Sequence, residues 1–225
     1  METQNPFIIP IAIIIAGAII GGAIFYSTKT RDTGQVAQQD ATTKTKPVSA
    51  VTSKDHIRGN PEGAITVIEY SDLQCPYCQS FHTTMARVIG EAEDVRWVYR
   101  HFPLTQIHAN ALPAAIASEC VARLAGNAAF WIFTDRVFQD QASMGNAQYV
   151  SFAKDLGIAQ DNFTACLADT SLADKVNAQT QEAIESGGRG TPYNVVITAS
   201  GKQAPFSGAL PYATVQQILD QARKN

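Results

Sequence analysis

Two cysteines separated by two residues, in the run Cys75-Pro76-Tyr77-Cys78, have the spacing most suggestive of chemistry. The run follows an apolar, β-branched segment and opens a segment with helical periodicity, so we expect it at a strand-to-helix junction. Pro76 suits the first helical position. Cys75 then falls at the helix N-cap, where free backbone N–H groups and the positive end of the helix dipole favour a thiolate. Cys78, one turn further along, can resolve a mixed disulfide formed on Cys75.

The same two cysteines could instead supply half of a zinc site. Such a site needs two further ligands, and the sequence holds no second C-x-x-C and no H-x-x-x-H pattern. We therefore predict redox chemistry with Cys75 as the nucleophile, without a metal and without a cofactor.

The other two cysteines, Cys120 and Cys166, lie far apart in segments with helical spacing. An even number of cysteines in a chain that opens with an export-type segment fits an oxidising compartment. We predict one working pair and one structural disulfide, Cys120 to Cys166. Two buried free thiols, which behave as small hydrophobic residues, are the alternative.

Two polar residues are candidates to assist the thiols. Glu69 lies in the apolar segment before Cys75, where burial would raise the pKa of its carboxyl group and let it exchange a proton with Cys78. A solvent-facing glutamate at a strand edge is the alternative. His82 follows Cys78 by four residues and shares its helix face, but we favour a structural role for it over a contact with the thiol.

The elements that must position these residues have a clear order: strand–helix–strand, a helical block, then strand–strand–helix. The expected strands are residues 64–70, 95–101, 193–198 and 203–206. The expected helices are residues 75–90, 112–124, 128–138, 147–156, 161–167, 172–185 and 212–222. This order fits a thioredoxin-like α/β sheet interrupted by a helical insertion.

Several runs resemble the DsbA-like branch of the thioredoxin superfamily. They are residues 59–64, Glu69-Tyr70-Ser71-Asp72, the cysteine run at 75–78, residues 99–104 and Gly190-Thr191-Pro192. The resemblance spans about residues 55–220 and implies a thioredoxin fold with an inserted helical domain at about 107–186. It also implies that Pro192 after Thr191 is cis and lies against the cysteines, and that an acid at Glu69 supports them.

The beginning of the chain differs from the rest in composition. Residues 7–25 carry no charge. At 1.5 Å per residue, a helix of these residues would be about 28 Å long, close to the roughly 30 Å thickness of the hydrocarbon core. We predict an uncleaved transmembrane anchor at 1–26, a flexible linker at 27–54 and the DsbA-like domain at 55–225; a cleaved signal peptide is the alternative. Lys29 and Arg31 favour a cytoplasmic location for the domain C-terminal to them, but the cysteine chemistry favours the outside.

Together these features predict a single-pass cell-membrane protein whose catalytic domain lies on the extracytoplasmic side. The predicted activity is that of a protein-disulfide oxidoreductase acting through residues 75–78. Its expected partners are thiols of exported proteins and a membrane-bound reoxidising partner. A net charge of −3 offers no basic surface for nucleic acid.

Three alternatives remain open from the sequence. The Pro76-Tyr77 pair, which helps to set the redox poise, also occurs in glutaredoxins and some isomerases, so an isomerase or reductase of the same fold is the first. A non-catalytic module that holds a soft metal or a client is the second. A permanent disulfide staple at residues 75–78 is the third.

Overall fold

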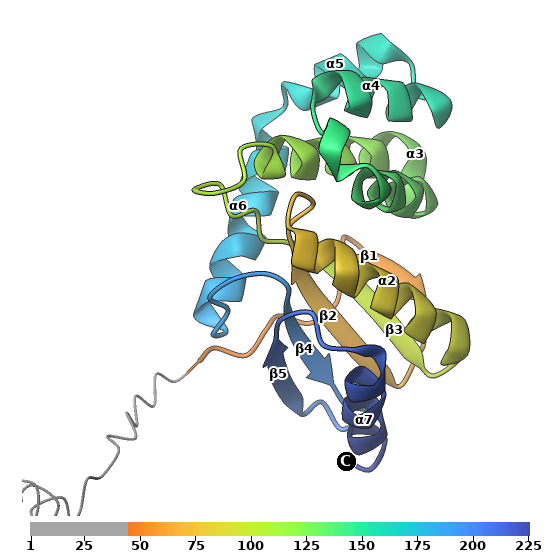
Figure 1. Ribbon diagram of the computed structural model, residues 1–225, viewed down its shortest axis with the longest axis vertical. Coiled ribbons are helices and arrows are strands. Elements are labelled where there is room, and N and C mark those ends of the chain that lie inside the picture. Colours follow the sequence, from red (N-terminus) through yellow and green to blue (C-terminus); the bar gives the residue numbers. More distant parts are fainter. Residues whose placement is uncertain (1–44) are drawn as a thin grey trace, which may run out of the picture. The chain divides into compact units, whose positions relative to one another are not determined.

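A five-stranded mixed sheet forms the centre of the computed structural model, which describes residues 45–225 (Figure 1). The strands are β1 (His56–Gly59), β2 (Ile65–Ser71), β3 (Val95–His101), β4 (Tyr193–Ile197) and β5 (Gln203–Ser207). The helices are α2 (Pro76–Glu91), α3 (Ala111–Gln139), α4 (Asn146–Asp155), α5 (Gln160–Leu167), α6 (Thr170–Glu185) and α7 (Tyr212–Arg223), with a short 3₁₀ helix, η1 (Gln141–Ser143).

The strand order β1-β3-β2-β4-β5 puts β2 at the centre of the sheet. β2 pairs in parallel with β3 and antiparallel with β4, while β1 and β5 form the two antiparallel edges. All seven residues of β2 are buried. This explains why the strand is an almost continuous apolar run: helices cover both of its faces.

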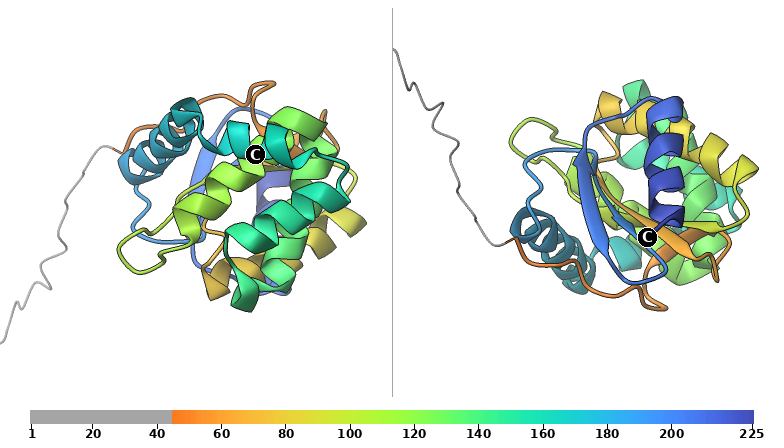
Figure 2. Two further views of the ribbon diagram at one scale, coloured as in Figure 1. Left: turned by 90° about the horizontal axis from the view of Figure 1, so that it is seen from above. Right: turned by 90° about the horizontal axis from the view of Figure 1, so that it is seen from below.

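The side chains of β2 alternate between two hydrophobic cores. Ile65 and Val67 pack into the larger core with α2 and α7, whereas Ile68 and Tyr70 pack into a smaller core with α6. Figure 2 shows α6 and α7 on opposite sides of the sheet. Glu69 obeys the same alternation, so its side chain belongs to the face that α2 covers.

A block of helices is inserted between β3 and β4, and it lies over one end of the sheet (Figure 1). Its longest member, α3, contains a kink at Gly126, where φ is +85°. A glycine tolerates this left-handed conformation, which side chains disfavour. The break separates the two helices that the sequence predicts at 112–124 and 128–138. The strand order and the helices inserted between β3 and β4 together confirm the predicted thioredoxin-like α/β fold with a helical insertion.

The expected linker at 27–54 and the structure differ over residues 45–54, which are held against the domain. The backbone N–H of Val48 donates to Gln203 Oε1 at 2.8 Å, and that of Ser49 donates to Glu182 Oε1 at 2.8 Å. The Val48 side chain is buried in the smaller core. The linker-like composition is misleading here because the segment is anchored mainly by its backbone groups.

The predicted anchor at 1–26 and the linker through residue 44 lie outside the described residues. Within residues 45–225, none of the helices combines the length and the apolar character that crossing a membrane requires. Two described elements, β1 and η1, were not predicted from the sequence.

Candidate active site

The cysteine run lies at the junction between β2 and α2, as its sequence context indicates. Cys75 is the N-cap of α2, with φ −73° and ψ 124°, and Pro76 occupies the first helical turn. The proline lacks an N–H group that would have no partner at this position anyway. The remaining N–H groups of the first turn are therefore free to face the Cys75 sulfur.

The two sulfurs have opposite electrostatic surroundings. Hydrogen bonding from the Cys78 thiol, helped by the backbone N–H groups of Cys78 and Tyr77, lowers the pKa of Cys75 to about 6, although burial opposes the shift. Burial raises the pKa of Cys78 well above its ordinary value, and the hydrogen bond to Cys75 adds to the effect. At neutral pH, Cys75 is therefore a thiolate and Cys78 a thiol.

Access from solvent also distinguishes the two cysteines. Cys75 keeps 3 % of its surface exposed and Cys78 keeps none. Tyr77, between them, is 68 % exposed and stands on the surface beside the pair. An incoming sulfur can thus reach Cys75 first, which matches the order that exchange through a buried resolving cysteine requires.

The loop before β4 brings Thr191 and Pro192 to the cysteines. The Thr191–Pro192 peptide bond is cis. Cys75 Sγ lies 3.6 Å from the carbonyl oxygen of Thr191, across 116 residues of sequence. The structure therefore gathers Cys75, Cys78, Thr191 and Pro192 into one site.

Glu69 lies inside the sheet, on the strand that leads to the cysteines. Its side chain is completely buried, and Trp97 Nε1 donates a hydrogen bond to Glu69 Oε2 at 2.9 Å. Burial raises the pKa of Glu69 to about 8, so the carboxyl group is largely protonated at neutral pH. Its charge, when present, contributes to the raised pKa of Cys78. The alternative of a solvent-facing glutamate does not hold.

Asp72 is a buried residue of the site for which the sequence indicated no role. Its Oδ1 accepts from the N–H of Gln74 at 2.7 Å, and its Oδ2 accepts from the N–H of Leu104 at 2.8 Å. Its own N–H donates to Cys78 Sγ at 3.4 Å. His108 Nδ1 lies 2.8 Å from Oδ2. An acid three residues before the cysteine run is the one sequence signal that could have indicated this network.

Gln141, in η1, connects the helical insertion to the cysteine loop. Its Nε2 donates to the carbonyl oxygens of Leu73, at 2.8 Å, and of Cys75, at 3.1 Å. These carbonyl groups flank the turn that presents the Cys75 sulfur. No local pattern in the sequence marks Gln141, because its partners are more than 60 residues away.

His82 is buried and has a structural environment. Its Nε2 lies 2.6 Å from Asp135 Oδ1, and Arg58 pairs with the other carboxylate oxygen at 2.6 Å. Its ring packs against Phe138 with centroids 4.6 Å apart. The hydrogen bond of its ring thus goes to Asp135 and not to Cys78.

Cys120 and Cys166 form a disulfide that joins α3 to α5, with their Cα atoms 5.7 Å apart. Both cysteines are buried among the apolar residues of the larger core. This pair is distinct from Cys75 and Cys78, which are free thiols in the structure.

Comparison with known proteins agrees closely with the fold. A family model described as Thioredoxin matches residues 51–221. The crystal structure of Pseudomonas aeruginosa DsbA2 is similar, with a TM-score of 0.66 and 23% identity, over 80% of this chain and 98% of that one. A thioredoxin-like oxidoreductase from Silicibacter pomeroyi DSS-3 gives a TM-score of 0.65 and 24% identity, over 77% and 95%. At these identities the likeness concerns the fold.

Curated relatives of higher identity are much longer proteins. The Na(+)/H(+) antiporter NhaA 3 of Salinispora tropica is 34% identical over 170 residues, which are 76% of this chain and 26% of the antiporter. The Na(+)/H(+) antiporter NhaA 1 of Salinispora arenicola is 30% identical over 167 residues, 69% of this chain and 25% of the antiporter. The chain spans about a quarter of the length of these relatives.

Proposed function

The chain belongs to the Thioredoxin family whose model it matches, and from that premise we propose that it is a protein-disulfide oxidoreductase that forms disulfide bonds in exported proteins. One observation carries the proposal. Two cysteines at a helix N-terminus have pKa values shifted in opposite directions, with Cys75 lowered to about 6 and Cys78 raised. This difference suits one sulfur to attack and leave and the other to resolve.

The reaction is an exchange of one disulfide for another. A client thiolate attacks Cys75 Sγ in the oxidised pair, a client–Cys75 disulfide forms, and the Cys75–Cys78 bond breaks with its electrons on Cys78. Cys78 takes up a proton, for which buried Glu69, with its pKa of about 8, is a suitable donor. A second client thiolate then attacks the client sulfur and displaces Cys75. Two electrons pass from the client dithiol to the cysteine pair.

The low pKa of Cys75 favours the oxidising direction. A thiolate stabilised in the reduced form makes the disulfide form a stronger oxidant, and it is also the better leaving group. A reductase or an isomerase of the same fold would hold the pair at a more negative potential. The reduction potential of Cys75–Cys78, measured against glutathione buffers, separates these functions, and we expect it above that of thioredoxin, about −270 mV.

The proposed location is the extracytoplasmic side of the cell membrane, with residues 1–26 as a single-pass anchor and a membrane-bound partner that reoxidises the cysteines. The disulfide between Cys120 and Cys166 supports an oxidising compartment. Protease added to intact spheroplasts should remove the domain if it lies outside. Protection of the domain until the membrane is opened would contradict this location.

A trapping experiment tests the function itself. The Cys78→Ser variant lacks the resolving sulfur, so mixed disulfides between Cys75 and clients should accumulate in the cell and disappear on reduction. The Cys75→Ser/Cys78→Ser variant is the matched control and should trap nothing. Absence of reducible adducts from Cys78→Ser cells would remove the basis for an oxidoreductase.

A further inference from the structure

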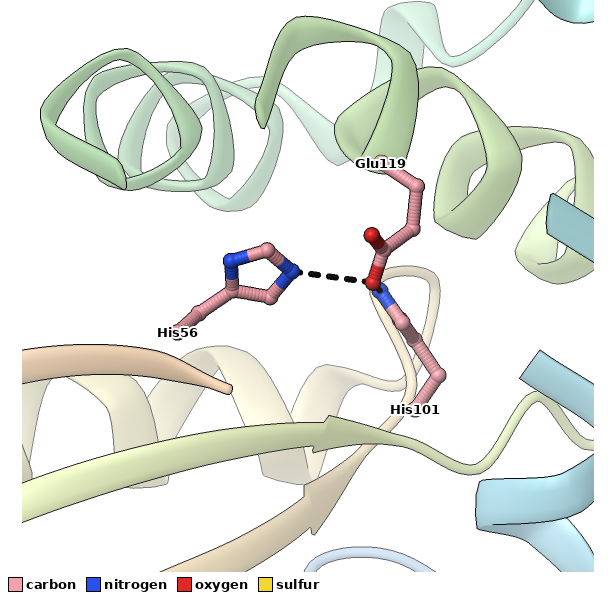
Figure 3. A group of neighbouring side chains, drawn as sticks. All are labelled: His56, His101 and Glu119. Carbon is pink, nitrogen blue, oxygen red and sulfur yellow. Dashed lines mark hydrogen bonds and ion pairs between the residues drawn. The ribbon is translucent and has the colours of Figure 1, made fainter. Parts of the chain in front are cut away.

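A second group of chemically active side chains lies apart from the cysteines, where β1, β3 and α3 meet. Figure 3 shows His56 from β1, His101 from the end of β3 and Glu119 from α3 converging on one point. All three residues are buried. One nitrogen of each histidine and one carboxylate oxygen lie within 4.8 Å of one another.

We propose that these three residues form a divalent-metal site that binds Zn²⁺ through the two imidazoles and the carboxylate. His56 Nε2 lies 2.9 Å from Glu119 Oε1, and His101 Nε2 lies 3.3 Å from the same oxygen. Bonds of 2.0–2.1 Å at tetrahedral angles set neighbouring ligand atoms about 3.3 Å apart. Each histidine nitrogen therefore already lies near the distance from the carboxylate oxygen that two ligands of one ion would have. Two histidines and one glutamate, with a fourth position open, is an established zinc ligand set.

Lys175, on α6, already brings a positive charge to this group. Its Nζ lies 2.7 Å from Glu119 Oε2 and 3.4 Å from His56 Nε2. A cation therefore contacts two of the three proposed ligand residues, and a metal ion must displace it. Displacement is feasible because the Lys175 side chain is 28% exposed. A cavity of about 310 Å³, lined by His56, Glu119 and Lys175, gives an ion a way in.

The imidazole rings are held in place by aromatic neighbours. The His56 ring stacks on Phe130, with centroids 3.6 Å apart and planes 12° apart. Tyr99 meets the His101 ring edge-on at 5.2 Å. Ligands whose side chains are already ordered lose little conformational entropy when they bind. To bind the ion, each histidine must present the lone pair of Nε2 and keep its proton on Nδ1.

The position of the site would let a bound ion connect two parts of the domain. His56 and His101 belong to the sheet, whereas Glu119 belongs to the inserted helices. An ion bound by all three would join the sheet to the insertion. It would stabilise the folded domain by mass action, because the unfolded chain does not hold the three ligands together.

Zinc titration of the full chain carrying Cys75→Ser and Cys78→Ser tests the site, because this parent variant has no free thiols to compete for zinc. With a chromogenic chelator as competitor, we expect one equivalent of Zn²⁺ to bind. Loss of an outer-shell partner alone weakens metal binding about 10–100-fold, so Glu119→Gln and His101→Asn should each weaken it at least about a hundredfold.

Two further variants make the test specific. Lys175→Ala removes the competing cation and keeps all three ligands, so it should bind zinc about tenfold more tightly than the parent. His108→Asn removes an imidazole that is paired with a carboxylate elsewhere, at Asp72, and should leave the affinity unchanged. The proposal is overturned if neither the parent nor Lys175→Ala shows saturable binding, or if Glu119→Gln binds as tightly as the parent.

Thermal unfolding supplies a second readout. At a hundredfold excess of zinc over its dissociation constant, the unfolding midpoint of the parent should rise by about 5–10 °C, and that of Glu119→Gln should not move. If Glu119→Gln does not fold, His101→Asn takes its place. An equal zinc-induced shift in the parent and in the folded ligand variant would mean that the ion binds elsewhere, and the proposed site would be rejected.

Discussion

The two cysteine pairs have the same side chains but lie in contrasting environments. Cys75 and Cys78 stand at the beginning of α2, beside a loop and near buried polar groups. Cys120 lies within α3, and Cys166 lies one residue before the end of α5, both among apolar side chains. Helix N-termini stabilise a thiolate, whereas helix C-termini disfavour one. The surroundings, more than the cysteines themselves, distinguish the proposed reactive pair from the structural one.

Spacing along the chain reinforces this difference. Cys75 and Cys78 close a loop of a few residues, so their bond constrains the unfolded chain little. Cys120 and Cys166 are 46 residues apart, so their bond removes far more freedom from the unfolded chain. The first pair can open and close at small conformational cost, and the second pair holds two helices of the insertion together.

Replacing the proposed nucleophile should have the largest effect. We expect Cys75→Ser to lower the rate of oxidation of a dithiol peptide at least about 1,000-fold, since a serine hydroxyl does not take part in disulfide exchange. Cys120→Ala/Cys166→Ala should stay within about tenfold of the natural protein at a temperature where it is folded. Comparable losses in the two variants would abolish the distinction between the pairs.

The structural pair should dominate stability instead. Closing a loop of 46 residues is worth about 4 kcal/mol on the chain-entropy estimate, so Cys120→Ala/Cys166→Ala should lose an amount of that order. Chemical denaturation of the oxidised proteins measures it. Cys75→Ala/Cys78→Ala is the matched control and should lose much less. A larger loss in the control than in the test variant would reverse the assignment of the two roles.

Most of the helices and strands could be predicted from local sequence patterns. The apolar run before the cysteines predicted β2 within one residue at each end. The small, helix-breaking Gly126 lies between two helices that the sequence predicted separately. The run at 75–78 and the Thr191-Pro192 dipeptide identified the centre of the site, the former by its spacing and the latter through family resemblance.

Features that depend on polar contacts between residues far apart in the sequence could not be predicted from it. β1 has four residues, His-Ile-Arg-Gly, too few to show a period, and it is defined by its pairing with β3. Gln141 acts on backbone groups that any residue could supply. His56, His101 and Glu119 come from three separate elements, so no motif spacing connects them. Such contacts become visible only when the sheet and the insertion are assembled.

The buried acid near the reactive pair gives a smaller, pH-dependent effect. Burial raises the pKa of Glu69 to about 8, so the folded protein retains a proton that the unfolded chain releases above about pH 4.5. Folding stability therefore falls as pH rises from about 4.5 to 8. Glu69→Gln removes this loss, and each pKa unit corresponds to about 1.4 kcal/mol.

Thermal unfolding of the oxidised proteins, in which neither thiol of the reactive pair titrates, measures this effect. Glu69→Gln should unfold at least about 3 °C above the natural protein at pH 8, and the two should coincide at pH 4. The Cys120–Cys166 disulfide has no proton to titrate, so Cys120→Ala/Cys166→Ala should show the same stability loss at both pH values. A gain for Glu69→Gln that is equal at pH 4 and pH 8 would point to packing, not to charge.

The smallest effect should come from loss of the contact between the helical insertion and the loop that carries Cys75. Gln141→Ala removes the hydrogen bonds from the insertion to the carbonyl groups of Leu73 and Cys75, which should lower stability by about 1 kcal/mol. A looser turn holds the N–H groups less firmly around the Cys75 sulfur. The pKa of Cys75, near 6 in the natural protein, should then rise by up to about half a unit.

Alkylation of the reduced protein across pH measures this shift, which corresponds to a slower reaction at pH 6 by up to about twofold. Gln148→Ala is the matched control, because Gln148 Nε2 donates to the Asp140 carbonyl at 2.8 Å, within the helical insertion. It should lower stability by a similar amount and leave the alkylation profile unchanged. A hydrogen bond that organises the turn must act on the thiolate as well as on the fold, so only Gln141→Ala should change the alkylation profile. Equal alkylation profiles for the two variants would mean that the insertion stabilises the cysteine loop without affecting the pKa of Cys75.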